Sequence, residues 1–301
     1  MVEAAVTSAA SSTPPHGLWF DAWERLKRNR AAVAAAVVIV TIALLAALGP
    51  ALVAHRYDSL DWEQIAAPPR WDGSHWHTAH WLGTDRLGRD VFVRSLYGVR
   101  LSLAIGLLAT IVSLLIGTAW GAIAGYVGGR VDSLMMRAVD IFNSLPYIFL
   151  VIILTTLFDR GNLFVLFFAI GAVGWVTMAR IVRGQALSLR RKEFVQAAIA
   201  LGARPSHILL RHIVPNAIGP VIVYATLTIP QMILYESFLS FLGLGVHEPL
   251  ASLGTLIREG SVEMEAAVWL LLTPAGLLAV LLVCFGLLGD GLRDALDPGD
   301  S

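Results

Sequence analysis

Long apolar runs alternate with short polar segments along most of the chain. A run of about 18 or more uncharged residues predicts a membrane-spanning helix, because a hydrocarbon core of about 30 Å takes roughly 20 helical residues to cross. The pattern predicts six such helices, at residues 31–54, 101–127, 138–158, 161–179, 212–235 and 266–289. The sequence therefore indicates an all-α membrane protein with six transmembrane helices.

The polar segments divide the chain further. In residues 19–26, bulky apolar and charged residues alternate at the spacing of an interfacial helix. The expected parts are a cytoplasmic tail with this interfacial helix at 1–30, a first transmembrane anchor at 31–54, an extracytoplasmic segment at 55–100, a core at 101–290 that includes a helical platform at 184–214, and a cytoplasmic carboxy-terminal tail at 291–301.

Composition supports a membrane location. Hydrophobic residues make up 56% of the 301 positions, charged residues 15%, and the mean hydropathy is +0.70. These values exclude an ordinary soluble globular domain. The one cysteine, Cys284, lies in the last predicted span, so no intramolecular disulfide can form.

Basic residues predict the orientation. With a cytoplasmic amino terminus, fourteen of the 22 lysines and arginines lie on the inner side and the other eight on the outer side. Four of the fourteen cluster just before the first span: Arg25, Lys27, Arg28 and Arg30. Since cytoplasmic loops carry an excess of basic residues, we expect both termini and the platform at 184–214 in the cytoplasm.

The expected extracytoplasmic segment ends in residues suited to turns and caps. Gly83 and Gly88 suit tight turns, and Asp85 and Asp90 suit turns and helix capping. An apolar stripe at helical spacing follows and leads into the second span. We therefore expect a folded turn directly before that helix.

Residues 190–216 form a polar, basic interruption between two apolar runs, with the pattern of two short helices. Gly202 can adopt the left-handed conformation that ends a helix, and Pro205 is compatible with the first turn of the next. Ala197 and Ala198 are small enough for another protein to approach closely. We therefore predict a helical platform that a soluble partner contacts. The alternative is a basic loop that merely follows the positive-inside rule.

The sequence carries no recognised catalytic motif. It has no phosphate-binding Gly-rich loop followed by Lys-Ser/Thr, no His-Glu-x-x-His, no Cys-x-x-Cys and no nucleophile elbow. We therefore expect no enzymatic activity in this chain and no cofactor or metal bound by it.

Several stretches resemble the C-type permease subunits of bacterial peptide importers of the ATP-binding-cassette (ABC) class. The resemblance extends from Gly83 to the end of the chain and, more weakly, to the amino terminus. The stretches that carry it are residues 83–90, 179–185, 190–194, 211–216, 236–245 and 289–298.

The resemblance implies the type I ABC importer permease fold, also called MetI-like, in a bacterial inner membrane. It further implies that the importer takes up oligopeptides and that this chain forms half of the pathway. The implied partners are a B-type peptide permease, two cytoplasmic ABC ATPases that use ATP and Mg, an extracytoplasmic peptide-binding protein and membrane lipids. No nucleic acid is expected as a partner.

The resemblance also assigns the platform to the ATPase. The spacing from Gln196 through Gly202 to Pro215 is that of the loop with which such permeases engage their ATPases. The implied coupling residues are Glu193, Gln196, Ala197, Ala198, Gly202, Ala203, Arg204, His207, Arg211 and His212. Many permeases carry glutamate where this chain has Gln196, so we expect a weaker electrostatic contact there with docking retained.

Three polar residues are candidates for the pathway or a gate: Glu236, Ser237 and Asn143. An acid near a helix centre costs about 2.5–3.5 kcal/mol on insertion scales and usually faces a cavity or a partner. We hypothesise that Glu236 lines an outer gate; the alternative is an interfacial acid paired with an arginine. Arg137 and Asp140 are spaced for an i,i+3 pair.

Other interpretations stay open at this stage. Three histidines within six residues, His75, His77 and His80, invite a metal site, although incidental histidines in a wet loop fit better. Dipeptides or nickel are alternative substrates. An ion-coupled secondary transporter would need charges deep in several helices, and a membrane scaffold or receptor would use the platform without transport.

Overall fold

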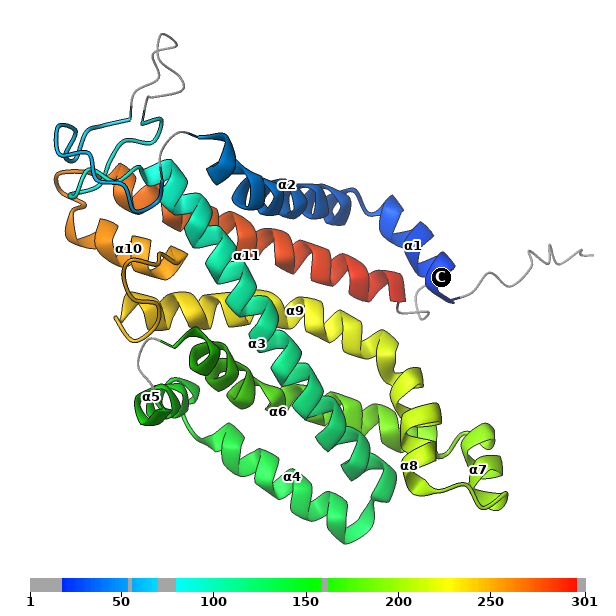
Figure 1. The fold of residues 1–301 in the computed structure, drawn as a ribbon. Helices are drawn as coiled ribbons and strands as arrows, with labels where there is room; N and C mark the ends of the chain where they lie inside the picture. Colours follow the sequence, from blue (N-terminus) through cyan, green and yellow to red (C-terminus); the bar gives the residue numbers. More distant parts are fainter. Residues whose placement is uncertain (1–17, 54–55, 70–79, 159–161, 297–301) are drawn as a thin grey trace, which may run out of the picture.

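The computed structural model describes residues 18–53, 56–69, 80–158 and 162–296, which form helices joined by short turns (Figure 1). Within these residues the only β-type pairing is an isolated bridge between Thr84 and Asp90. The helices are α1 (Leu18–Arg28), α2 (Arg30–Leu52), α3 (Val91–Val127), α4 (Gly129–Ser144), α5 (Tyr147–Phe158), α6 (Leu163–Arg190), α7 (Glu193–Ala200), α8 (Pro205–Ile208), the π-helical turn η2 (Leu209–Ile213), α9 (Val214–Phe241), α10 (Leu253–Val262) and α11 (Trp269–Leu296). The predicted all-α architecture is confirmed.

Within the described residues, five helices are long and apolar enough to cross a membrane: α2, α3, α6, the continuous helix from Pro205 to Phe241, and α11. Several of these helices extend well beyond the predicted apolar runs, because a helix can continue through residues that are polar. Thus α3 begins at Val91, inside the segment expected to be extracytoplasmic, and α11 continues to Leu296, inside the expected carboxy-terminal tail.

The stretch predicted as a span at 138–158 is not one straight helix. Two helices, α4 and α5, cover this stretch and meet at an angle of 90°. The break falls at Leu145, whose backbone is extended with φ −83° and ψ 138°. Pro146 follows, and a proline disfavours the helical conformation of the residue before it. The pair is therefore one bent span or a re-entrant loop.

Small residues bring α3 and α6 into close contact. Gly117, Gly121 and Gly125 recur every fourth residue on the same face of α3. A Cβ added at Gly125 would lie 2.6 Å from the carbonyl oxygen of Arg183, and one added at Gly121 would overlap the Ala179 carbonyl oxygen. Such spacing lets helix backbones approach in membranes, so these glycines fix the central helix pair.

Two ion pairs attach α4 to α6. The Asp132 carboxylate accepts two hydrogen bonds from the Arg183 guanidinium, at 2.5 and 2.6 Å. Asp140 accepts one from Arg180 Nη2 at 2.8 Å. The predicted pair of Arg137 with Asp140 is therefore wrong, because the Asp140 side chain faces a guanidinium on the neighbouring helix instead of one on its own.

Arg100 on α3 compensates for a proline in α2. Pro50 has no N–H to donate to the carbonyl of Ala46, four residues earlier. Arg100 supplies the missing donors, with Nη2 2.8 Å and Nε 3.1 Å from the Ala46 oxygen. Since an unpaired carbonyl is costly in lipid, this contact stabilises the proline-containing turn of α2.

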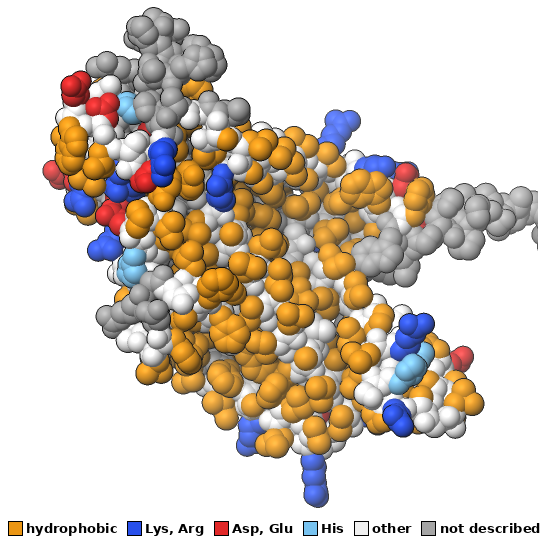
Figure 2. All heavy atoms as spheres, viewed as in Figure 1, with side chains coloured by type: hydrophobic (Ala, Val, Ile, Leu, Met, Phe, Trp, Pro, Cys, Tyr) orange, Lys and Arg blue, Asp and Glu red, His pale blue; other side chains and the backbone are white. Residues whose placement is uncertain are grey.

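The bundle has two chemically different ends, as Figure 1 shows. One end, here called the platform end, carries α7, α8, α1 and the last turn of α11. The opposite end, here called the far end, carries residues 56–69, residues 80–90 and α10. In Figure 2 the charged side chains gather at these two ends, and an orange apolar surface lies between them. This distribution suits a bundle that spans a bilayer.

The turn predicted before α3 is present. Gly83 and Gly88 have φ values of 76° and 72°, in the left-handed region. Asp90 is the N-cap of α3, and its Oδ1 accepts the Val93 N–H at 2.8 Å. The Thr84 hydroxyl donates to the carbonyl of Gln64 and accepts the Ala67 N–H. Residues 83–90 therefore fold back on residues 61–67.

Candidate functional site

The candidate site is the platform, residues 184–214. Its first short helix, α7, ends in a defined hydrogen-bonded cap. At the end of α7, the Gly202 N–H donates to the Ile199 carbonyl at 3.0 Å and the Ala203 N–H to the Ala198 carbonyl at 3.1 Å. Gly202 has φ 78°. These two bonds define a Schellman motif, so the helix stop predicted at Gly202 is confirmed.

A π-helical turn joins the platform to α9. Pro205 occupies the first turn of α8, as predicted. Further on, Pro215 has no N–H for the Arg211 carbonyl, and the chain widens: the Val214 N–H donates to the Leu209 carbonyl, five residues back. Asn216 Nδ2 donates to the His212 carbonyl at 2.6 Å. The platform thus continues into α9 without a loop.

Three buried aliphatic side chains anchor the platform to the bundle. Val195 of α7, Ile208 of α8 and Ile213 of η2 are buried, and they pack with Met178 and Val182 of α6. Burying such a side chain fully contributes about 1.5–3 kcal/mol. The platform is therefore attached through its inner face, and its outer face stays uncovered in this chain.

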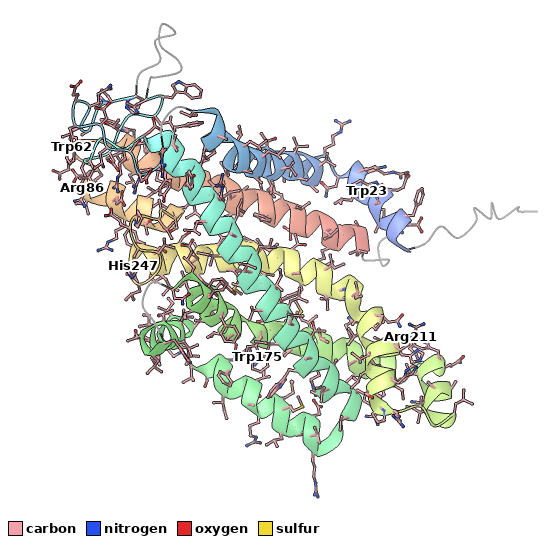
Figure 3. All side chains as sticks on the ribbon, in the orientation of Figure 1. Trp23, Trp62, Arg86, Trp175, Arg211 and His247 are labelled. Atoms are coloured by element: carbon pink, nitrogen blue, oxygen red, sulfur yellow. The ribbon has the colours of Figure 1, made fainter. Side chains whose placement is uncertain are left out.

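Most of the predicted coupling residues lie on that outer face. The exposed ones are Glu193, Gln196, Ala197, Gly202, Arg204, His207 and Arg211. Figure 3 shows Arg211 pointing away from the bundle beside α7 and α8. Ala198 and Ala203 instead face inward and pack against the anchoring cluster, and His212 is half-buried.

Gln196 has a local role that the sequence did not reveal. Its Nε2 donates to the carbonyl oxygen of Arg190, the last residue of α6, at 2.8 Å. A carboxylate in the same place could not donate this hydrogen bond. The amide at this position therefore ties α7 to the end of α6.

An apolar tip is the platform feature that sequence analysis missed. Leu201 is 88% exposed, and Phe194 and Ile199 are also exposed. The Phe194 ring lies 6.1 Å from the His212 ring, which lies 6.0 Å from the His207 ring. The available signal was three bulky apolar residues within a polar segment predicted to lie outside the bilayer. An uncovered cluster of this kind marks a binding surface.

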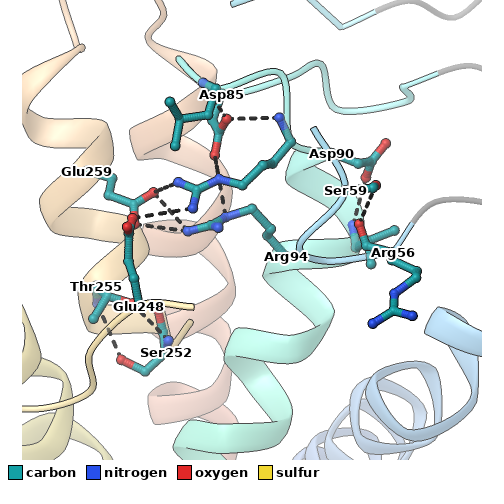
Figure 4. Close-up of polar contacts among 12 residues, drawn as sticks. Arg56, Ser59, Asp85, Asp90, Arg94, Glu248, Ser252, Thr255 and Glu259 are labelled. Carbon is teal, nitrogen blue, oxygen red and sulfur yellow. Dashed lines mark hydrogen bonds and ion pairs between the residues drawn. The ribbon is translucent and has the colours of Figure 1, made fainter. Parts of the chain in front are cut away.

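The far end carries a buried ion network (Figure 4). Arg89 Nε lies 2.6 Å from Asp85 Oδ2, and Arg94 Nη2 lies 2.9 Å from both oxygens of Glu259. Arg89 also reaches Glu259 and Glu248, each at 3.3 Å. Burial raises the pKa of the Glu259 carboxyl against the opposing effect of the two guanidinium groups. The network joins the turn before α3 to α10.

His80 belongs to the same end of the bundle. Its Nδ1 lies 2.7 Å from Asp90 Oδ2, and its Nε2 lies 3.6 Å from Asp61 Oδ2. The hydrogen bond with Asp90 raises the pKa of the His80 imidazole, against the effect of burial. His75 and His77 lie outside the described residues. Among the described residues, no three potential ligands are grouped to hold a metal.

The three candidate gate residues lie in different environments. Glu236 and Ser237 are buried near the end of α9. The Glu236 carboxylate contacts serine hydroxyls instead of an arginine, so the alternative of an arginine pair is wrong. Asn143 is exposed just before the break between α4 and α5, and no hydrogen bond within the described part of the chain joins it to Glu236. Their pathway role stays a prediction.

Comparison with known proteins identifies the class of this helical membrane bundle. Residues 117–299 match the family model "Binding-protein-dependent transport system inner membrane component", and residues 17–69 match "N-terminal TM domain of oligopeptide transport permease C". The chain belongs to the family of binding-protein-dependent transport system inner membrane components.

Curated relatives agree with this family assignment. The chain is 52% identical over 283 residues to the oligopeptide transport system permease protein OppC of Escherichia coli K12, covering 94% of this chain and 92% of the relative. It is 49% identical to OppC of Haemophilus influenzae, with 94% and 89% covered. It is 43% identical to the dipeptide transport system permease protein DppC of Bacillus subtilis, with 92% and 85% covered.

A solved structure of the inward-facing MetNI methionine ABC transporter matches with a TM-score of 0.56 at 20% identity, covering 69% of this chain and 96% of that chain. At this identity the match shows the fold alone. The expected MetI-like permease fold is confirmed.

Proposed function

We propose that this chain is the permease subunit of an ABC importer of oligopeptides and forms half of the translocation pathway. The substrate class is supported by relatives at 49% and 52% identity that are named oligopeptide permeases. The fraction of each chain covered supports an equivalent subunit. The chain itself would bind no cofactor, and ATP with Mg would be used by two cytoplasmic ATPases.

The platform would dock on those ATPases. The observation that carries this step is the uncovered apolar tip around Leu201 on a platform that is rigidly anchored by its opposite face. An exposed leucine flanked by small residues can insert into a groove of a partner protein, as binding hot spots do. Glu193, Gln196, Ala197, Gly202, Arg204, His207 and Arg211 would surround that contact.

Movement of the platform would reach the far end directly. The helix from Pro205 to Phe241 is continuous over 37 residues, about 55 Å at 1.5 Å per residue. A continuous helix of this length would carry a displacement at one end to the other, as packed helices do in domain motion. The permease would alternate between inward and outward openings, together with a B-type permease subunit and a peptide-binding protein outside.

The orientation in the membrane belongs to the same proposal. Both termini and the platform would face the cytoplasm of an inner-membrane protein. Helix α1 supports this placement because exposed Phe20 and Trp23 and the basic residues that follow suit the lipid headgroup region. Lys27 Nζ lies 5.3 Å from the Trp23 ring centroid. Membrane lipids would therefore be contacted by α1 as well as by the spans.

Assembly and uptake test the proposal. The chain should co-purify with a second permease and two ATPases, and membranes with the full complex should accumulate labelled oligopeptides. Labelled dipeptides and radioactive nickel are the comparison substrates. Purification as an active carrier without ATPases would contradict the proposal, and so would nickel uptake without peptide uptake.

A bulky substitution tests the platform itself. Ala197→Trp should block close approach and reduce ATPase co-purification at least tenfold. Ala51→Trp places the same side chain on another exposed alanine, at the end of α2, and should leave ATPase binding unchanged. Equal ATPase binding by both variants would contradict docking at the platform.

A further inference from the structure

Glu236 is an acid that the described contacts leave without a cation. Its side chain is fully buried, with 0% exposure, in the next-to-last turn of α9. Ser102 Oγ of α3 lies 2.7 Å from Glu236 Oε2, and Ser240 Oγ of α9 lies 2.8 Å from Oε1. Ser237 Oγ lies 3.4 Å from Oε2. Both carboxylate oxygens therefore accept hydroxyl hydrogen bonds.

The two close serines also receive backbone N–H groups from the segment after α9. Ser102 Oγ accepts the N–H of Leu253, the first residue of α10, at 3.1 Å. Ser240 Oγ accepts the N–H of Val246 at 3.1 Å. A hydroxyl has one proton and two lone pairs. Each serine can therefore accept a hydrogen bond from a backbone amide and donate one to Glu236. We call these two amide–serine–Glu236 chains the relays.

The relays hold a segment that lies close against the bundle. Loop 242–252 and the start of α10 lie against α3 and α9 through glycines. A Cβ at Gly98 would lie 3.2 Å from the carbonyl carbon of Ser252, and one at Gly254 would overlap Ser237. The buried side chains of Val246 and Leu253 add apolar packing to these close backbone contacts. The other polar attachment of α10 is Glu259, which contacts Arg89 and Arg94.

A position on the pathway does not explain this geometry. An acid that met the substrate or pathway water would show some exposure, whereas Glu236 shows none. A small pocket at the far end is lined by Asp85, Arg94 and Glu259 among others, and Glu236 does not line it. The carboxyl group is instead occupied by hydrogen bonds with serines of its own chain.

We propose that Glu236 is a positioning residue that fixes loop 242–252 and α10 against α3, and thereby sets the surface that the substrate-loaded binding protein recognises. This inference rests on the proposed function. It places the effect on docking at the far end, because α10 carries Glu259 and the loop carries the exposed His247 and Glu248 (Figure 3). The platform and its ATPase contact would be untouched.

The test uses the complete importer reconstituted in lipid nanodiscs, with ATPase activity measured against the concentration of peptide-loaded binding protein. Glu236→Gln keeps the size of the side chain, but its NH2 group replaces one of the two acceptor oxygens. The serine on that side then loses the acceptor for its hydroxyl proton. We expect the half-saturating concentration of binding protein to rise about tenfold or more. Basal ATPase activity and the maximal rate should stay within twofold of wild type.

Single-relay variants keep the test decisive if Glu236→Gln does not assemble. Ser102→Ala and Ser240→Ala should each raise the half-saturating concentration by a smaller factor. Hydrogen exchange should speed up at the Leu253 amide in the first variant and at the Val246 amide in the second. Glu265→Gln, at an exposed acid after α10, is the matched control and should change nothing.

Two results would overturn the inference. One is an unchanged half-saturating concentration in every variant, and the other is a fall in the maximal or basal rate with normal half-saturation, which would place Glu236 in the pathway or in coupling. A wild-type complex that peptide-loaded binding protein fails to stimulate would instead contradict the proposed function. The two failures are therefore distinguishable.

Discussion

The two ends of the bundle treat polar and apolar groups in opposite ways. At the platform end, the apolar side chains Leu201, Phe194 and Ile199 are exposed and basic side chains surround them. At the far end, charged side chains are buried and paired with one another, as Arg94 is with Glu259. The buried charges of the far end are therefore paired within the chain, whereas the apolar side chains of the platform tip stay uncovered. Substitution of a buried charge at the far end should thus change stability, and substitution at the platform tip should change ATPase binding.

The largest effect is expected at the buried arginine of the far end. Arg94→Ala leaves Glu259 and Asp85 with only Arg89, and breaking a buried ion pair from one side typically costs about 3–5 kcal/mol. Thermal unfolding of the purified complex should show a marked loss of stability. Arg56→Ala removes the exposed pair with Asp58 and should change little. Equal stability of both variants would contradict the stabilising pairing of buried charges at the far end.

A smaller effect, on binding alone, is expected at the platform tip. Leu201→Asp places a charge where a partner would bury an apolar side chain, and ATPase affinity should fall by about 2 kcal/mol or more, roughly thirtyfold. Stability of the chain should not change because Leu201 has few neighbours. Leu134→Asp, at another exposed leucine on α4, controls for the added charge. If Leu201→Asp lowers the stability of the chain but not its affinity for the ATPase, the platform tip is not a binding surface.

The pH response of the far end is expected to be smaller still. The contact with Asp90 raises the pKa of His80 above its ordinary value of 6.5. The stabilisation is therefore fully present below about pH 6.5 and is lost as the pH rises through the raised pKa. The unfolding temperature of wild type should fall over this interval, and that of His80→Gln should fall less. A wild-type curve that rises instead would contradict the assignment.

The smallest effect is expected at Gln196. Gln196→Glu loses the hydrogen bond to the Arg190 carbonyl, worth about 0.5–1 kcal/mol, so amides of α7 should exchange up to about fivefold faster. Gln196→Met loses the same bond without adding charge and should give a similar increase. If only the glutamate variant changes, charge and not the hydrogen bond is responsible.

Much of the architecture could be predicted because it depends on local rules. Apolar run length located the spans, Gly202 and Pro205 located the end of one platform helix and the start of the next, and Asp90 located the cap of α3. Hydropathy could not give the 90° bend between α4 and α5, because it counts apolar residues but does not record the backbone restriction that Pro146 imposes on Leu145.

The candidate site was predicted in position but not in detail. Spacing identified the platform residues, yet it could not show that Ala198 and Ala203 face inward or that Leu201 forms an exposed tip. Which face of a short helix is covered depends on the helices packed against it. For α7 and α8 these are α6, which directly precedes α7, and α3 and α9, which contribute Ala122 and Val221.

The sequence by itself determined that the chain is a helical membrane protein, that it has a basic platform and that it resembles a known family. It could do so because hydropathy, capping and motif spacing are local properties. Only the tertiary structure decided which partners the charged groups take: Asp140 with Arg180, Arg100 with the Ala46 carbonyl, and Glu236 with serines of two helices. Such choices depend on distances of a few ångströms between residues tens of positions apart. Packing sets those distances, and no local pattern records them.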